Sequence, residues 1–146
     1  MTSDRLLYRI EIHATPDRVW QAITDPEWTR KYFHETSIRS SWKTGSPVYY
    51  DMPDGSLASE GTLLEYDPPH RLVMTMRFTF DETLGKEPPS RVTYELESRG
   101  DTTVLTLIHD QIPPYTREMV KDGWIGIIEG LARVLAPDDE PAVSRV

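Results

Sequence analysis

The sequence contains no cysteine. This absence excludes disulfide bonds, thiol chemistry and every metal site that needs a cysteine ligand. The chain also lacks an apolar run long enough to span a bilayer, and residues 1–16 show no apolar stretch followed by a cleavage site. We therefore expect a cytoplasmic protein without a signal peptide. The net charge of −8 at pH 7 argues against nucleic-acid and membrane partners, because both require a basic protein face.

The sequence motifs that identify several common enzyme classes are missing as well. The chain has no GxSxG, no HExxH, no P-loop and no GxGxxG sequence. Its histidines are scattered, and no pair has the spacing of metal ligands: His13, His34, His70 and His109. We therefore predict no metal, no cofactor and no assigned catalytic residue.

Hydrophobic patterning at the N-terminal end predicts one strand followed by two short helices. Residues 6–14 alternate between apolar and polar side chains, which is typical of a half-buried strand. Thr15-Pro16-Asp17 and Asp25-Pro26-Glu27 each supply a capping residue, a proline and an acid in the order that begins a helix.

Residues 36–111 contain six further strand-like segments, separated by turn sequences such as Pro53-Asp54-Gly55. The connections are too short for crossover helices, so these strands should pair antiparallel. We predict an α+β fold, in which a curved antiparallel sheet of about seven strands wraps around one long C-terminal helix. The chain length suits a single domain, placed at residues 1–136, and the acidic, proline-rich residues 137–146 are expected to form a flexible tail.

The expected C-terminal helix, residues 115–135, carries an unusual stripe of glycines. Gly123, Gly126 and Gly130 lie along one edge of its apolar face, although each glycine inside a helix costs about 1 kcal/mol relative to alanine. We interpret the stripe as a place where another backbone or a ligand approaches the helix, and we favour packing against the short helices or a neighbouring strand. On this interpretation, Gly126→Leu should disturb the protein more than Glu129→Leu.

Four sequence motifs, in order, resemble a known family: IEIHATPDRVWQAITDPEWTRKYF, LLEYDPPHRLVMTMRF, VTYELES with TTVLTLIHD, and GWIGIIEGL. The order of elements resembles the helix-grip fold of the START/Bet v 1-like (SRPBCC) superfamily. The motifs are similar to the C-terminal domain of the activator of heat-shock protein 90 ATPase. This resemblance implies a cavity between the sheet and the helix and no catalytic set shared by all members. Bacterial relatives usually carry tryptophan at the position of Tyr32, and often an aromatic residue at Met74 or Met76, so these departures suggest a reshaped interior.

A soft, aromatic inner surface is the candidate ligand site, and it comprises Met74, Met76, Phe78, Tyr94, His109, Trp124 and Ile128. His109 shares a strand face with Leu105 and Leu107, so it should point toward the helix near Trp124. Its imidazole either anchors a ligand or transfers a proton, or it is hydrogen-bonded to a neighbouring strand or a water.

Three functional hypotheses follow. The first is a non-catalytic or weakly catalytic protein that binds a small hydrophobic or aromatic ligand in this cavity. The second is an interaction module in stress response that assists a chaperone partner. The third is an enzyme similar to polyketide cyclases and aromatases, with His109 and Tyr94 handling protons. The expected assembly is a monomer or a homodimer.

Overall fold

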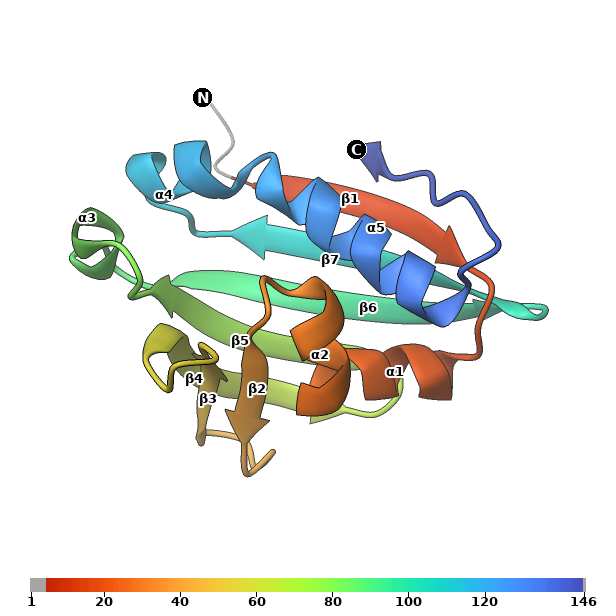
Figure 1. Ribbon diagram of the computed structural model, residues 1–146, viewed down its shortest axis with the longest axis horizontal. Coiled ribbons are helices and arrows are strands. Elements are labelled where there is room, and N and C mark those ends of the chain that lie inside the picture. The colour runs from red at the N-terminus through yellow and green to blue at the C-terminus, as the bar shows by residue number, and fades with distance from the viewer. Residues whose placement is uncertain (1–4, 146) are drawn as a thin grey trace.

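A computed structural model describes residues 5–145. One antiparallel sheet of eight strands runs in the order β2-β3-β4-β5-β6-β7-β1-β8, and helices α1, α2 and α5 cover one of its faces (Figure 1). The strands are β1 (Leu6–Ile12), β2 (Ser37–Ser40), β3 (Pro47–Asp51), β4 (Leu57–Asp67), β5 (Arg71–Phe78), β6 (Ser90–Arg99), β7 (Thr102–Asp110) and β8 (Ser144–Arg145). The helices are α1 (Pro16–Thr24), α2 (Pro26–Tyr32), α3 (Glu82–Gly85), α4 (Pro114–Val120) and α5 (Gly123–Leu135). The predicted α+β helix-grip fold is therefore confirmed, with eight strands rather than about seven.

The two short helices begin where their capping residues predict. The Thr15 side chain accepts a hydrogen bond from the backbone N–H of Arg18 at the start of α1. The Asp25 side chain accepts one from the N–H of Glu27 at the start of α2. Both caps satisfy backbone donors that a helix end leaves without partners.

The inner face of the sheet carries the alternating residues that the sequence places there. Residues from β5, β6 and β7 on this face are buried: Leu72, Met74, Met76, Val92, Tyr94, Leu96, Leu105, Leu107 and His109. They pack with the apolar face of α5, in which Trp124, Ile127, Ile128, Leu131 and Leu135 are buried. This layer between sheet and helix is the core of the protein.

The C-terminal helical region differs from the expected single rod. It forms two helices, because α4 ends at Val120 and α5 begins at Gly123. Gly123 therefore lies at the start of α5, so it does not carry the stability cost of a glycine inside a helix. A Cβ atom at Gly126 would meet no atom within 4 Å, whereas one at Gly130 would lie 3.1 Å from the Cβ of Tyr32 in α2. The predicted close approach is confirmed at Gly130 and is wrong at Gly126, which faces open space.

Residues 137–145 return to the sheet and end in β8, at the edge beside β1. Tyr8 and Arg9 of β1 pair with Arg145 and Ser144 of β8. His13 lies 3.0 Å from a carboxylate oxygen of Asp139. The flexibility of residues 137–146 stays a prediction.

Membrane-spanning helices and metal-ligand clusters were both sought in residues 5–145. No helix in this range is long and apolar enough to cross a membrane. Nor does this range bring together three or more histidine, aspartate or glutamate side chains in a way that could hold a metal ion.

Candidate functional site

The seven predicted ligand residues all border the layer between the sheet and α5. Six of them are buried: Met74, Met76, Tyr94, His109, Trp124 and Ile128. Phe78, at the end of β5, is only partly buried and packs against the edge of this core. The structure thus brings the predicted set together, mostly as tightly packed interior side chains.

His109 is held at both ring nitrogens. The indole N–H of Trp124 donates to Nδ1 of His109 over 2.9 Å. Nε2 of His109 lies 2.6 Å from the Ser90 hydroxyl oxygen, and that hydroxyl donates to the backbone carbonyl of Met76 over 3.1 Å. Because the serine proton is directed at Met76 and Nδ1 accepts, the consistent tautomer is neutral and carries its proton on Nε2. The predicted proximity of His109 and Trp124 is confirmed.

Burial lowers the pKa of His109 to about 4, although nearby Asp110 acts in the opposite direction. A proton on Nδ1 would also face the donating indole N–H of Trp124, so the charged form would lose that hydrogen bond. His109 is thus neutral at physiological pH and fully hydrogen-bonded within the protein. This geometry matches the second of its two predicted roles, an imidazole bonded to a neighbouring strand.

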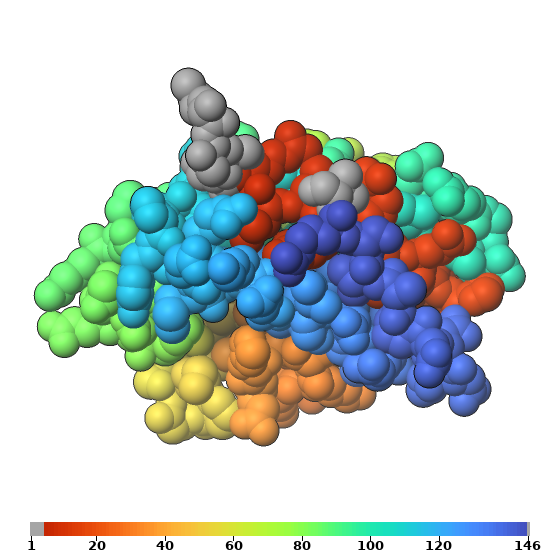
Figure 2. Space-filling model, turned by 90° about the horizontal axis from the view of Figure 1, so that it is seen from above, coloured from red at the N-terminus to blue at the C-terminus, as the bar shows by residue number. Residues whose placement is uncertain are grey.

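An open pocket lies at one end of the core, where β5 ends and α2 leads into β2. Its volume is about 300 Å³, and we call it the mouth pocket. Its wall consists of Phe33, His34, Thr36, Tyr50, Met52, Ala58, Ser59, Phe78 and Phe80. In Figure 2, the orange region that includes α2, the yellow β3–β4 turn, the green segment around α3 and the light-blue α4 lie around this end of the molecule.

A smaller hollow of about 100 Å³, the side pocket, adjoins the mouth pocket. Both share Phe33, His34, Phe78 and Phe80. The remaining wall of the side pocket comes from α4 and α5: Met119, Val120, Gly123, Trp124 and Ile127. The two pockets together extend from the sheet to the break between the two C-terminal helices.

Phe33 is positioned between the pockets and the core by the turn that ends α2. His34 and Glu35 adopt positive φ angles of 51° and 61°, which reverse the chain directly after Phe33. The Phe33 ring stacks on Tyr50 at a centroid distance of 4.5 Å and meets the edge of Trp124 at 5.8 Å. One aromatic ring therefore links the buried tryptophan to the wall of the mouth pocket.

Three polar residues interrupt this apolar wall: His34, Thr36 and Ser59. Thr36 already donates its hydroxyl to the backbone carbonyl of Phe33 over 2.6 Å. Ser59 lies on β4, where it pairs with Tyr50 of β3 on one side and with Phe78 of β5 on the other. Directly paired residues of antiparallel strands point to the same side of the sheet, so Ser59 shares the inner face with these two wall residues. Ser59 is 2 % exposed, and its hydroxyl is one of only two buried side-chain polar atoms in residues 5–145 without a hydrogen-bond partner.

Only two predicted ligand residues, Phe78 and Trp124, border these pockets. Tyr94 is absent from both walls, but its phenol lies close enough to that of Tyr50 for each to affect the pKa of the other. Burial raises the pKa of both phenols well above the usual range, so both stay neutral. The predicted ligand set as a whole stays a prediction.

Sequence reasoning did not single out the wall residues Phe33, Tyr50 and Ser59. The alternation of Val48, Tyr50 and Met52 in SPVYYDM was the signal that could have placed Tyr50 on the inner face. No comparable signal marks Ser59, because a serine between alanine and glutamate is equally typical of an exposed strand.

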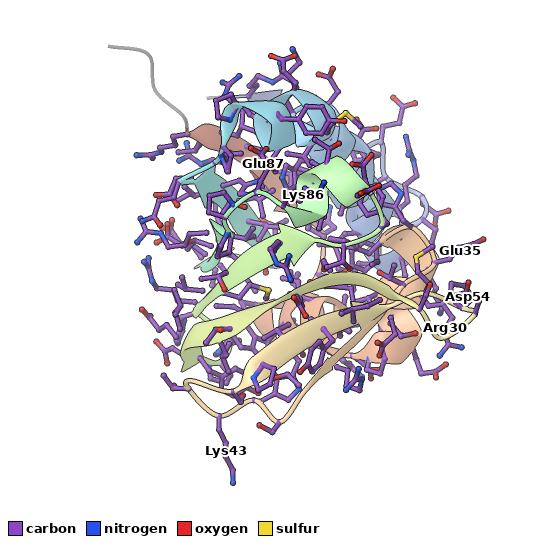
Figure 3. All side chains as sticks on the ribbon, turned by 90° about the vertical axis from the view of Figure 1, so that its left-hand side faces the viewer. Arg30, Glu35, Lys43, Asp54, Lys86 and Glu87 are labelled. Carbon is purple, nitrogen blue, oxygen red and sulfur yellow. The ribbon has the colours of Figure 1, made fainter. Side chains whose placement is uncertain are left out.

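The rim of the two pockets is apolar and exposed where Phe80 and Met119 lie, with exposed fractions of 60 % and 50 %. Tyr115, 40 % exposed, lies one helical turn before Met119 on the same face of α4. Glu87, which lies beside α4 in Figure 3, accepts hydrogen bonds from the backbone N–H and the hydroxyl of Thr116, over 2.8 and 2.9 Å. This contact fastens the loop after α3 to the first turn of α4, so the rim is built on an anchored segment.

Comparisons with known proteins extend over nearly the whole chain. The family described as activator of Hsp90 ATPase homolog 1-like protein matches residues 13–136. Among solved structures, CalU16 from Micromonospora echinospora superposes with a TM-score of 0.71 at 24% identity, over 92% of this chain and 77% of that one. PFC0360w, described as an HSP90 activator from Plasmodium falciparum, gives 0.73 at 22% identity, over 90% and 95%.

A third solved structure, described as the Aha1 dimer from Colwellia psychrerythraea, gives a TM-score of 0.70 at 18% identity, over 92% of this chain and 96% of that one. At these identities the likeness shows a shared fold. No curated protein sequence matches the chain.

Proposed function

The chain belongs to the family of activator of Hsp90 ATPase homolog 1-like proteins, and from this premise we propose that it binds a small hydrophobic molecule in the mouth pocket. The ligand lies between the inner face of the sheet and the helices, with Phe33, Tyr50 and Phe78 against it. The side pocket extends the site toward Trp124.

The single observation that carries this proposal is an apolar pocket of about 300 Å³ at the open end of a packed core. Small-molecule sites are concave, largely apolar and commonly 300–1,000 Å³ in volume, so this pocket lies at the small end of the range. Met52 and the phenylalanine rings supply an adaptable apolar surface.

Native mass spectrometry of the freshly purified protein tests the proposal, together with a variant that fills the pocket. Ser59→Leu places a larger apolar side chain on the inner wall, and Ser98→Leu makes the same change at an exposed position on β6. We expect a copurified small mass, or a bound naphthalene-class probe, with the unaltered protein and with Ser98→Leu but not with Ser59→Leu. Equal occupancy in all three proteins would place the ligand elsewhere.

A second candidate function, assistance to a chaperone, is favoured by the exposed apolar rim of Phe80, Tyr115 and Met119. Exposed apolar patches bounded by polar residues are typical of protein interaction sites. The family description and PFC0360w, the HSP90 activator among the similar structures, indicate heat-shock protein 90 as the partner to test.

The chaperone's ATP hydrolysis rate is the measurement for this candidate. A Phe80→Ser, Met119→Ser double variant should abolish any stimulation, whereas Leu64→Ser, at an apolar side chain 44 % exposed on β4, should preserve it. A hydrolysis rate that does not respond to the unaltered protein would contradict this function.

The enzyme hypothesis has no comparable support at His109. Both ring nitrogens of this histidine are hydrogen-bonded inside the protein, and neither pocket has His109 on its wall. We therefore propose no proton transfer by this residue.

A further inference from the structure

We propose that Ser59 selects the ligand, so that the mouth pocket takes an uncharged hydrophobic molecule carrying one hydroxyl or carbonyl group. This inference rests on the proposed function, because it names the ligand class of the same site. It concerns a single hydrogen bond between that group and the hydroxyl of Ser59.

The unpaired Ser59 hydroxyl is the first observation. A buried polar group without a partner costs about 1–3 kcal/mol, and native proteins contain few of them. The buried serine on β6, Ser90, differs from Ser59 because its hydroxyl is hydrogen-bonded to both His109 and the backbone carbonyl of Met76. Ser59 lacks such partners and forms part of the mouth-pocket wall. Its hydroxyl is covered in this structure, and rotation of this short side chain about its Cα–Cβ bond would turn the hydroxyl toward a ligand.

The second observation is the charge around the pocket. Within the described residues, no lysine or arginine forms part of the wall of the mouth pocket or the side pocket. Figure 3 shows Glu35 and Asp54 projecting at the same edge of the molecule, and they follow the wall residues His34 and Met52 closely in sequence. Arg30 projects there too, but its guanidinium is paired with Glu27 at 3.0 Å.

These charges disfavour an anionic ligand. A carboxylate entering an apolar pocket loses its hydration and needs a cation or several donors in return. Besides Ser59, the wall carries His34 and also Thr36, whose hydroxyl already donates to the backbone carbonyl of Phe33. Within residues 5–145 it contains no fixed cation, and the nearby acids would repel the charge of an anion. A neutral hydroxyl or carbonyl needs only the one partner that Ser59 provides.

Three probes that differ at one ring position separate these cases: naphthol, methylnaphthalene and naphthoate. Their dissociation constants would be measured by fluorescence with the unaltered protein and with Ser59→Ala. Because each ligand's own hydration is the same in both titrations, the change in the preference for naphthol over methylnaphthalene isolates the contact with Ser59. We expect Ser59→Ala to reduce this preference about tenfold, and naphthoate to bind most weakly to the unaltered protein.

Ser98→Ala serves as the control, since Ser98 is exposed on β6 and should leave every constant unchanged. If the probes bind but the preference for naphthol is the same in Ser59→Ala, the inference fails while the proposed function stands. The inference also fails if naphthoate binds as tightly as naphthol. If no probe binds the unaltered protein, the proposed function itself fails.

Discussion

Two neighbouring regions of the layer between sheet and helices are built from similar residues but differ in how their polar groups are satisfied. In the first, which we call the bonded cluster, the polar groups of Trp124, His109 and Ser90 bond one another in an unbroken chain. In the second, the mouth pocket, aromatic side chains surround about 300 Å³ of space, and the hydroxyl of Ser59 has no partner. The bonded cluster is satisfied by the protein alone, whereas the mouth pocket is where we propose that a further molecule binds. The difference separates the part of the core that provides stability from the part that we expect to bind.

The largest effect on stability should come from removing the buried indole ring of Trp124. Trp124→Ala deletes a side chain that is 2 % exposed and leaves Nδ1 of His109 without its donor. We expect the free energy of unfolding to fall by about 3–5 kcal/mol in urea denaturation. Phe80→Ala, at a ring that is 60 % exposed, should cost less than about 1 kcal/mol. Similar losses of unfolding free energy for both variants would contradict the distinction between a stabilising cluster and a binding pocket.

The pH dependence of stability should contain a contribution from His109 in the bonded cluster. An unfolded chain protonates histidine near pH 6.5, whereas the pKa of His109 in the folded protein is about 4. Between these values the unfolded state binds more protons, so stability falls as pH is lowered through this window. The loss should approach about 3 kcal/mol at pH 4.

Urea denaturation at several pH values, with His109→Gln for comparison, measures this contribution. The variant cannot titrate at this position, so its slope between pH 4 and 6.5 should be smaller. Nitrogen NMR of the imidazole should also show the Nε2-protonated tautomer at pH 7. A His109 signal that titrates near pH 6.5 would show that water reaches the bonded cluster.

The same substitution, serine to alanine, compares the bonded cluster with the mouth pocket, because each contains one buried serine. Ser90→Ala removes the partner of Nε2 of His109 and should destabilise the protein by about 1–3 kcal/mol. Ser59→Ala removes a buried hydroxyl that has no partner, so it should leave stability unchanged or raise it by about 1 kcal/mol. Thermal unfolding of the ligand-free proteins gives both values, and a destabilised Ser59→Ala would mean that its hydroxyl is already bonded.

The smallest effect concerns how closely α5 is packed. Gly126 faces open space, so Gly126→Ala should stabilise the helix by about 0.5–1 kcal/mol. At Gly130 the new Cβ would lie 3.1 Å from Tyr32, so α2 must shift slightly and the gain should be smaller or absent. Equal gains in urea denaturation would show that the contact between α2 and α5 adjusts freely.

Much of the core around the bonded cluster could be predicted from the sequence. The strict alternation around Met74 and Met76, and the position of His109 beside two leucines, place these residues on the inner face without reference to any other part of the chain. The helical spacing of Trp124 and Ile128 does the same for α5. Such periodicity is a local property, and local patterns suffice where one face is continuously buried.

The mouth pocket could not be predicted from such local patterns. The inner face of β4 includes Ser59 and Leu63, with Gly61 between them, so its apolar signal is interrupted. Gly61 is required because a Cβ there would lie 1.7 Å from the backbone oxygen of Thr75, a contact between strands that no local pattern encodes. The orientation of Phe33 likewise depends on a reversal after α2. These features arise from tertiary packing.

The order of the strands has a consequence for association with other chains. The two outermost strands, β2 with four residues and β8 with two, are the shortest in the sheet, while the longest, β4 and β6, lie inside it. Unpaired backbone on an edge strand is the usual template for aggregation through added strands, and short edges offer little of it. Because β8 covers part of β1, the return of the chain after α5 shields the longer strand from intermolecular β-pairing.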